Sequence, residues 1–214
     1  MTVLKVNEIF YSIQGESSFA GTPCVFIRLT GCNLRCSYCD TRYAYEDGEI
    51  MELSEISEKA ASFGCSLAEI TGGEPLLQQA TPLLISHLIE KGFHVLVETN
   101  GTQDIGKTDP RCVRIVDIKC PGSGEHEKND FANLNRITDR DEIKFVIADR
   151  TDYEYALQIL KQIRCGAKNP VHFSPVYGKL APCVLAEWML TDHADARLHL
   201  QLHKYIWPPE QRGV

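Results

Sequence analysis

The 214-residue sequence contains no run of about 18 apolar residues, so we expect no segment to span a membrane. Its start, MTVLKVNEIFYSIQGE, has no continuous apolar stretch of signal-peptide length, and we therefore expect a cytoplasmic protein. An excess of positive charge is missing as well. The formal net charge is −7 and the pI is about 5.5, unlike the basic footprint of a nucleic-acid-binding protein.

Internal repeats, low-complexity tracts and linkers are also absent. Hydrophobic residues make up 43% of the chain and charged residues 24%, which is ordinary for a globular protein. A chain of this length can bury a full core as one domain. We therefore predict a single domain over residues 1–214.

The cysteine content argues against a disulfide framework, because the count of nine is odd and the expected compartment is reducing. Three cysteines lie close together in GCNLRCSYCDT (31–41). The others are scattered, and we predict that each is a small buried hydrophobe: Cys24, Cys65, Cys112, Cys120, Cys165 and Cys183.

Short apolar runs alternate with amphipathic runs along the chain, a pattern typical of βαβ units with a parallel sheet. We expect strands at 24–30, 67–71, 94–99, 112–118, 142–147 and 170–175. Helices are expected from a cap at Ser54 to about Ser62, at 79–91 and at 152–164. About six mostly parallel strands are too few for an eightfold barrel, so we predict an α/β partial TIM-like barrel with helices outside.

Polar and glycine-rich motifs follow these strands. They are the cysteine cluster, TGGEP (71–75), ETNG (98–101), DIKCPGSG (117–124) and SPVYG (174–178). The carboxyl ends of parallel strands meet at one edge of a sheet, which is where open and closed α/β folds place their active sites. The sequence therefore predicts a functional site at this edge.

The spacing of the cysteine cluster is C-x3-C-x2-C, through Cys32, Cys36 and Cys39. Structural zinc needs four ligands, but the chain has no second C-x2-C, and His199 and His203 lie in LHLQLH, which alternates like a strand. A thioredoxin-like pair would leave Cys32 unexplained, and three merely structural cysteines do not suit so polar a loop.

An iron–sulfur cluster accounts best for three thiols on one tight loop. Cubane clusters are normally held by four thiolates, so three leave one iron without a protein ligand. An open coordination position is how a metal site binds a small molecule. The missing fourth cysteine thus indicates a cluster that binds a substrate or cofactor.

The cysteine motif after a first strand, with an aromatic residue before its last cysteine and with TGGEP after the next strand, resembles the radical S-adenosylmethionine superfamily. A narrower resemblance, nearly end to end, is to the 7-carboxy-7-deazaguanine synthase family. It rests on NEIFYSIQGESSFAGTPCVFIRLTGCNLRCSYCDT, EITGGEPLLQ, VETNG, VDIKCPGSGE and LQLHKYIW.

This resemblance implies a carbon–nitrogen lyase that converts 6-carboxy-5,6,7,8-tetrahydropterin to 7-carboxy-7-deazaguanine with loss of ammonia, on the route to queuosine and related 7-deazapurines. It implies a [4Fe-4S] cluster, S-adenosyl-L-methionine and Mg²⁺ as cofactors. The ring contraction would begin with a 5′-deoxyadenosyl radical, and no side chain is assigned as acid or base. A flavodoxin or ferredoxin electron donor and a homodimer are the implied partners.

The resemblance also implies roles for individual residues. Cys32, Cys36 and Cys39 would ligate the cluster, and Thr41 would bind Mg²⁺. Gly72 and Gly73 would allow close backbone approach. The cofactor would be bound by Tyr38, Asp40, Gly73, Glu74, Asp117, Lys119 and Ser174, with Glu74 accepting from the methionine ammonium.

For the substrate, the implied residues are Ile13, Gln14, Gly15, Arg28, Thr71 and Pro208. Arg28 also stands out physically, because it interrupts an apolar strand and a buried guanidinium needs a carboxylate partner. That partner is either the carboxylate of the implied substrate or a Glu or Asp of the protein. Pro208 is one of two adjacent prolines near a chain end that should fold over the substrate.

Two other functions are compatible with parts of the pattern. A glycyl-radical-enzyme activase would share the cysteine motif but should lack Arg28 and IQGE. A non-catalytic zinc or iron–sulfur module would have no need of GGEP and ETNG at strand ends. The Gly-containing polar segment 119–130 is, in addition, a candidate mobile lid.

Overall fold

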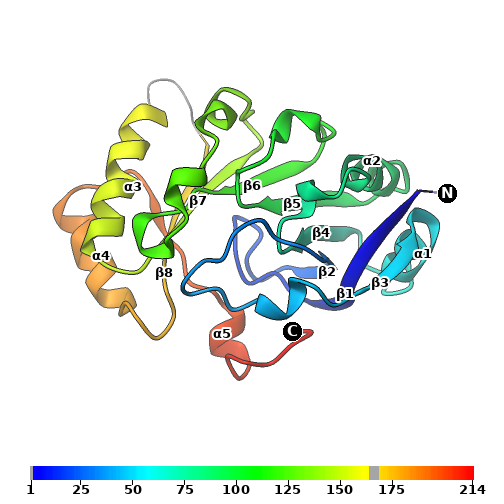
Figure 1. The fold of residues 1–214 in the computed structure, drawn as a ribbon. Helices are drawn as coiled ribbons and strands as arrows, with labels where there is room; N and C mark the ends of the chain where they lie inside the picture. The colour runs from blue at the N-terminus through cyan, green and yellow to red at the C-terminus, as the bar shows by residue number, and fades with distance from the viewer. Residues whose placement is uncertain (1, 164–168) are drawn as a thin grey trace.

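The computed structural model describes residues 2–163 and 169–214. They form a nine-stranded sheet in the order β3-β1-β2-β4-β5-β6-β7-β8-β9 (Figure 1). The run from β2 to β9 is parallel throughout. Its strands are β2 (Pro23–Leu29), β4 (Leu67–Gly72), β5 (His94–Thr99), β6 (Val113–Asp117), β7 (Glu142–Ile147), β8 (Val171–Pro175) and β9 (Arg197–Leu198). All six predicted strands are present within about two residues at each end.

Three strands were not predicted. β1 (Val3–Ile13) pairs antiparallel with β2, and β3 (Glu49–Glu52) pairs antiparallel with β1 at the edge of the sheet. β9 takes only Leu198 from LHLQLH, and the short helix α5 (His203–Ile206) follows, so the strand-like reading of that segment is wrong for most of its length. The pairing with β8 ends where the His199 N–H donates to the Phe173 carbonyl at 2.9 Å, and the Leu202 N–H donates instead to the Gly15 carbonyl at 3.0 Å, so the alternation does not continue as a strand.

Helices flank the sheet as predicted (Figure 1). They are α1 (Leu53–Ala61), α2 (Thr81–Glu90), α3 (Arg150–Ile163) and the unpredicted α4 (Pro182–Thr191). The cap of α1 is Glu52 and not Ser54, and the Glu52 backbone N–H donates to Glu55 Oε2 at 2.7 Å. Short 3-10 helices lie in the connections: η1 (Arg42–Ala44), η2 (Pro75–Leu77), η3 (Ile105–Lys107), η4 (Pro121–Ser123), η5 (His126–Lys128) and η6 (Phe131–Asn135).

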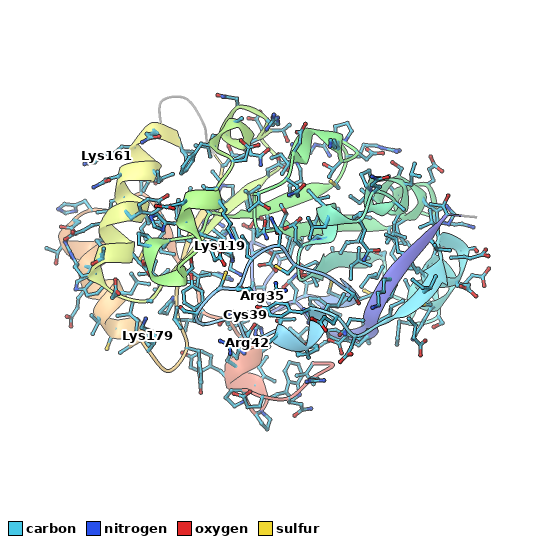
Figure 2. All side chains as sticks on the ribbon, in the orientation of Figure 1. Arg35, Cys39, Arg42, Lys119, Lys161 and Lys179 are labelled. Carbon is cyan, nitrogen blue, oxygen red and sulfur yellow. The ribbon has the colours of Figure 1, made fainter. Side chains whose placement is uncertain are left out.

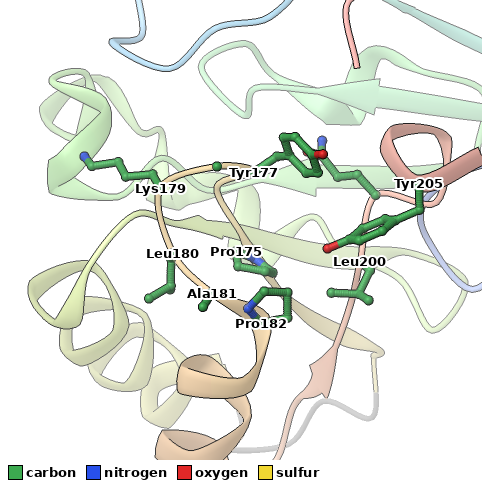
Figure 3. A pocket seen from close by; sticks show the side chains of 10 residues that line it. Pro175, Tyr177, Lys179, Leu180, Ala181, Pro182, Leu200 and Tyr205 are labelled. Atoms are coloured by element: carbon green, nitrogen blue, oxygen red, sulfur yellow. The ribbon is translucent and has the colours of Figure 1, made fainter. Parts of the chain in front are cut away.

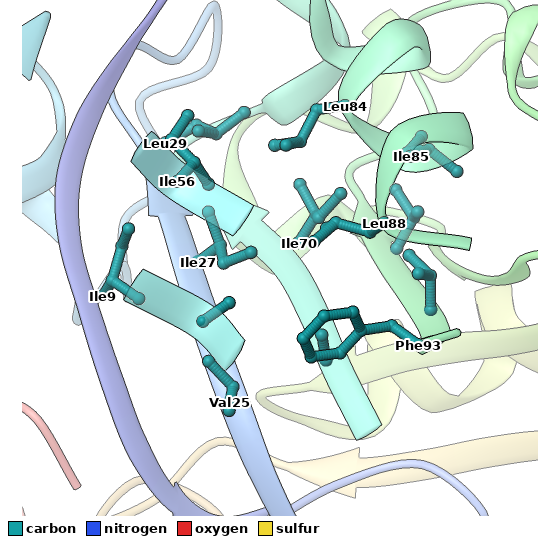
Figure 4. Close-up of a cluster of buried hydrophobic side chains, with 14 of the residues drawn as sticks. Ile9, Val25, Ile27, Leu29, Ile56, Ile70, Leu84, Ile85, Leu88 and Phe93 are labelled. Atoms are coloured by element: carbon teal, nitrogen blue, oxygen red, sulfur yellow. The ribbon is translucent and has the colours of Figure 1, made fainter. Parts of the chain in front are cut away.

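Two apolar clusters join the outer face of the sheet to the helices. In the first, Ile27 and Ile70 of the sheet face Ile56 of α1 and Leu84 and Leu88 of α2 (Figure 4). The second packs β7 and β8 against α3 and α4 through Phe145, Tyr153, Phe173 and Leu185, among others. Burying each such side chain contributes about 1.5–3 kcal/mol. Among the described residues, no helix is long and apolar enough to cross a membrane.

The inner face of the sheet changes character along the strands. Near the strand starts it carries a small apolar cluster that includes Phe26, Leu67, Leu96 and Ile115. Two residues further along the same strands stand Arg28, Glu69, Glu98 and Asp117. Successive side chains on one face of a strand are two residues apart, so each strand carries an apolar residue below a charged one. The sheet therefore presents a polar layer at its carboxyl edge.

The scattered cysteines are mostly buried, as predicted. Burial is confirmed for Cys24, Cys112 and Cys120, and Cys65 is partly buried. The prediction is wrong for Cys183, which is exposed near the start of α4, where Leu185 is the residue that faces the core. Cys165 lies outside the described residues.

Candidate functional site

A cavity of about 750 Å³ opens at the carboxyl edge of the sheet, as the strand-end motifs predict. Most predicted site residues line it: Ile13, Gln14, Gly15, Arg28, Cys32, Cys36, Tyr38, Cys39, Asp40, Thr41, Thr71, Gly73, Asp117 and Lys119. Glu74, Ser174 and Pro208 do not line it. The fold thus brings together side chains from β1, β2, β4 and β6 with the loop that carries the three cysteines.

The cysteine loop runs between β2 and η1, and Cys32, Cys36 and Cys39 are partly buried free thiols. Burial raises the pKa of Cys36 to about 11, so this thiol holds its proton until a metal replaces it. In the described part of the chain, no three His, Cys, Asp or Glu side chains converge as they would on a single metal ion. A cubane needs no such convergence, because each of its irons takes one thiolate.

Gly73 packs directly against the cysteine loop. A Cβ at this position would lie 2.2 Å from the Gly31 carbonyl oxygen and 2.7 Å from Cys32 Cβ. The next backbone N–H, that of Glu74, donates to the same Gly31 oxygen at 2.7 Å. Gly73, the second glycine of GGEP, is therefore required for the contact between the end of β4 and the cysteine loop, independently of any ligand that binds there.

Glu74 is fully buried behind this contact. Its carboxylate accepts from the backbone N–H groups of Leu76 at 2.9 Å and Asn100 at 2.6 Å, and from Thr99 Oγ1 at 2.9 Å. Burial raises the Glu74 pKa to about 7, although these hydrogen bonds oppose the rise. Glu74 thus joins the ends of β4 and β5, while its predicted contact with an ammonium stays a prediction.

Two predicted cofactor residues carry buried oxygen atoms without a partner among the described residues. Asp117 Oδ2 pairs with Lys119 Nζ at 2.7 Å, but Asp117 Oδ1 has no hydrogen bond. Ser174 Oγ, on β8, is fully buried and also unpartnered. A buried polar atom without a partner is costly, so each marks a place where a ligand or water supplies the missing bond.

Arg28 has the protein partner that was one of its two predicted alternatives. Its Nε lies 2.7 Å from Glu8 Oε1, and its guanidinium lies 5.6 Å from the centroid of the Phe10 ring. Its two terminal nitrogens donate no hydrogen bond within the described residues, and the side chain lines the cavity. The guanidinium can therefore hold Glu8 through one edge and a second carboxylate through its fork.

Gln14 is more occupied than predicted. Its side-chain Oε1 accepts from the backbone N–H of Glu16 at 3.0 Å, and its Nε2 donates to Glu69 Oε2. An amide has two N–H donors, so one remains for a ligand. Gln14 thus shapes the turn after β1 as well as lining the cavity.

Asp40 and Thr41 form an oxygen pair at the edge of the cavity. Thr41 Oγ1 donates to Asp40 Oδ1 at 2.9 Å, and Lys204 Nζ lies 2.7 Å from Asp40 Oδ2. Burial alone would raise the pKa of Asp40, but Lys204 outweighs it and holds the pKa below its ordinary value. The carboxylate is therefore ionised at neutral pH.

The chain end lies over the cavity, beside the cysteine loop (Figure 1). Arg212 stacks on the Tyr43 ring, 3.9 Å from its centroid. Both prolines are exposed, and Pro209 lines the cavity whereas Pro208 does not, so a substrate contact through Pro208 stays a prediction. The Gln211 backbone N–H donates to the Pro208 carbonyl at 2.9 Å, which closes a turn at the two prolines.

Sequence reasoning missed the charged group beneath the cavity. Lys144 of β7 is buried and pairs with Glu98 Oε1 at 2.8 Å and with Glu16 Oε2. Burial would raise the Glu16 pKa, but Lys144, together with His203 and Gln201, outweighs it and lowers that pKa to about 2. Lys144, Glu69 and Glu98 each interrupt an apolar strand, which is the same signal that singled out Arg28.

A smaller cavity of about 380 Å³ adjoins the main one, and Tyr177 and Gln201 line both (Figure 3). Its walls are largely apolar. The ring of Tyr205 stands edge-on to that of Tyr177, with 5.8 Å between the centroids.

Comparison with known proteins agrees with this geometry. The family model of the radical SAM superfamily matches residues 26–165. A 7-carboxy-7-deazaguanine synthase of Chlorobaculum tepidum is 48% identical, over 99% of this chain and 97% of the relative. One of Koribacter versatilis is 44% identical, over 99% of this chain and 100% of the relative.

Solved structures show the same fold. QueE from Escherichia coli superposes with a TM-score of 0.78 at 24% identity, covering 93% of this chain and 94% of that one. SuiB of Streptococcus suis reaches 0.57 at 14% identity, over 79% of this chain and 46% of its own. The predicted α/β partial barrel is confirmed. With near-complete coverage at up to 48% identity, the chain belongs to the 7-carboxy-7-deazaguanine synthase family of the radical SAM superfamily.

Proposed function

We propose that the protein converts 6-carboxy-5,6,7,8-tetrahydropterin to 7-carboxy-7-deazaguanine with loss of ammonia. The observation that carries the proposal is a single cavity lined both by the three-cysteine loop and by Arg28 with its free guanidinium fork. Two relatives named 7-carboxy-7-deazaguanine synthase match this chain over almost their whole length. The substrate is a small molecule, and a cavity of about 750 Å³ is large enough for it together with a nucleoside cofactor.

The superfamily's cofactors are a [4Fe-4S] cluster and S-adenosyl-L-methionine, and the residues present fit both. Cys32, Cys36 and Cys39 supply three thiolates to the cluster and leave one iron open. Asp117, which lines the cavity together with Gly73 and has an unpartnered oxygen, suits the methionine end of the cofactor, while a contact from the buried, unpartnered Ser174 stays a prediction. When bound, the cluster and the cofactor together would supply the radical chemistry, for which these residues would provide the binding site.

The chain's own residues bind and orient the substrate. Arg28 would hold the substrate carboxylate as a charge-assisted pair while Glu8 keeps the guanidinium in place. Ile13, Gln14 and Gly15 would contact the pterin edge from the turn after β1, and Thr71, paired in register with Arg28, would contact the ring from β4. The chain end with Pro209 would close the cavity and exclude water.

A magnesium site at Thr41 is part of the proposal. Mg²⁺ prefers oxygen ligands and keeps several waters, so it binds through few protein groups. The Thr41 hydroxyl stands beside the ionised Asp40 carboxylate at the edge of the cavity. Thr41 would then hold the metal against the substrate, with Asp40 as its neighbouring negative charge.

Further parts of the proposal concern the protein in the cell. A flavodoxin or ferredoxin would reduce the cluster, the product would enter queuosine or another 7-deazapurine, and the enzyme would act in the cytoplasm as a homodimer. One sheet runs through the described residues, which supports a single domain. No acid or base is assigned among the side chains that line the cavity.

The test is anaerobic turnover of the reconstituted, reduced enzyme with S-adenosyl-L-methionine, Mg²⁺ and 6-carboxytetrahydropterin, followed by mass spectrometry. The wild type should form 7-carboxy-7-deazaguanine. Arg28→Ala should form none, yet keep its iron and still cleave the cofactor, whereas the exposed control Arg111→Ala should match the wild type. Cofactor cleavage without product in the wild type would refute this substrate and direct attention to a glycyl-radical activase.

A further inference from the structure

We propose that Glu125 is a positioning residue that holds the cysteine loop in its cluster-binding conformation before the cluster arrives. It acts with the segment 120–125, which we call the clip. The inference rests on the proposed function, because it takes Cys32, Cys36 and Cys39 as the cluster ligands. The clip lies within the segment 119–130, which the sequence offered as a candidate mobile lid.

The clip contacts the cysteine loop on both sides of Cys36. The backbone N–H of Arg35 donates to Glu125 Oε1 at 2.7 Å. The backbone N–H of Ser37 donates to the Ser123 carbonyl at 3.0 Å, and Ser37 Oγ donates to the Gly122 carbonyl at 2.7 Å. Three hydrogen bonds therefore fix the two residues that flank the central cysteine.

The clip is itself anchored to the core. Asp152 of α3 is fully buried, and its carboxylate accepts from the backbone N–H of Gly122 at 2.6 Å and from that of Ala148 at 2.9 Å. A Cβ on Gly122 would lie 2.5 Å from Asp152 Oδ2, so only glycine allows this approach. The segment is thus tied to a helix on one side and to the cysteine loop on the other, which is unlike a mobile lid.

The Glu125 carboxylate is held and ionised. Lys128 Nζ lies 2.7 Å from Glu125 Oε2, and the Glu125 backbone N–H donates to Ser123 Oγ at 3.0 Å. The bond from Lys128, followed by that from the Arg35 N–H, keeps the pKa of Glu125 below its ordinary value. A hydrogen bond to an ionised acceptor is about twice as strong as a neutral one, so Glu125 contributes the strongest of the clip contacts.

The loop needs such support because it has little structure of its own. Within the described residues, its internal backbone bonding between the cysteines is one bond, from the Cys39 N–H to the Cys36 carbonyl at 3.2 Å. Arg35, which is labelled in Figure 2, adds a bond from Nη1 to the Cys32 carbonyl at 2.8 Å. Ordering a loop costs conformational entropy, and contacts that order it in advance spare the cluster that cost on binding.

The experiment compares three variants with the wild type. Glu125→Ala removes the acceptor for the Arg35 N–H. Glu125→Gln keeps a side-chain carbonyl that can accept the same bond. Glu127→Ala is the matched control, because Glu127 is an exposed glutamate two residues away with no hydrogen bond or ion pair among the described residues. Hydrogen exchange of residues 32–40 is measured in the cluster-free protein. In the cluster-loaded protein, two quantities are measured: the rate of iron release to a chelator and the reduction potential of the cluster.

In Glu125→Ala the loop should exchange roughly tenfold faster and release iron roughly tenfold faster, as expected for loss of one charged hydrogen bond. The cluster potential should shift as well. Glu125→Gln should restore most of this behaviour, and Glu127→Ala should match the wild type. Wild-type exchange and iron release in Glu125→Ala would overturn the inference, as would a failure of Gln to rescue. The exchange measurement needs no cluster, substrate or turnover. The inference about Glu125 can therefore be refuted while the proposed function stands, and the proposed function can be refuted while the inference about Glu125 stands.

Discussion

Lys144 is the residue whose replacement should reveal most about the charged layer beneath the cavity. It is buried on β7 and holds two carboxylates, those of Glu16 and Glu98, which both line the cavity. Lys144→Met keeps the length of the side chain and removes its charge. The change leaves two buried carboxylates without their cation.

The expected loss of stability is about 3 kcal/mol at pH 7. Removing one partner of a buried ion pair typically costs about 3–5 kcal/mol. The fall of the Glu16 pKa from 4.5 to about 2 corresponds to about 3 kcal/mol of stability at neutral pH, of which Lys144 supplies the largest share and His203 and Gln201 the rest. Burial holds the pKa of Glu98 above its ordinary value even in the presence of Lys144. The pair with Glu98 therefore adds little to the stability lost in Lys144→Met, and the expected loss stays at about 3 kcal/mol, the lower end of that range.

The sign of the pH dependence is a sharper test than the magnitude. In the wild type, the contribution of Glu16 is complete above pH 4.5 and is lost as the pH falls towards about 2. Without the ammonium, burial raises the pKa of both carboxylates, so their ionised forms destabilise the fold near pH 7 and their protonation relieves it. The difference between wild type and variant should therefore shrink between pH 7 and pH 5.

The assay is urea unfolding of the cluster-free protein at both pH values under reducing conditions. Lys179→Met is the control, because Lys179 is exposed and forms no ion pair among the described residues (Figure 2). It should change stability by less than about 0.5 kcal/mol. A loss below about 1 kcal/mol in Lys144→Met, or a loss equal at both pH values, would refute the reasoning.

Gly73→Ala should destabilise the cluster-free protein by about 1–3 kcal/mol, because the new Cβ would stand 2.2 Å from the Gly31 carbonyl oxygen. Urea unfolding measures this loss of stability. A loss under about 0.5 kcal/mol would contradict the prediction, because it would show that the cysteine loop moves aside without cost. Cys36→Ala should lose most of its iron after anaerobic reconstitution, because one of three thiolates is gone, whereas the exposed Cys183→Ser should bind as much iron and sulfide per chain as the wild type. Full iron content in Cys36→Ala would remove Cys36 from the ligand set.

Much of the fold could be predicted because it depends on local patterns. The six central strands are short apolar runs between turn residues, and any parallel sheet buries such runs on both faces. The edge strands were harder to see. β1 alternates buried and partly exposed residues without a strong period, and β3 has only four residues, so the pairing of β1 with β2 and of β3 with β1 decides their structure.

The site divides in the same way. The cysteine spacing and GGEP carry their meaning in a few adjacent residues, so both could be recognised without a structure. The clip, by contrast, joins Arg35 to Glu125 across 90 positions. The motif DIKCPGSG marks this segment as the end of a strand, but nothing in the sequence indicates that Glu125 bonds to Arg35 or that Gly122 bonds to Asp152.

The sequence by itself determined that charged residues interrupt the strands, that three thiols share one loop, and that glycine-rich turns follow the strands. Only the tertiary structure decided which charges pair. Arg28 meets Glu8, and Lys144 meets Glu16 and Glu98. The fold also decided that Pro209 lines the cavity and Pro208 does not. The reason is physical. A buried charge must find an opposite charge, but which one it finds depends on distances of a few ångströms between strands, and these are set by the packing of the whole sheet.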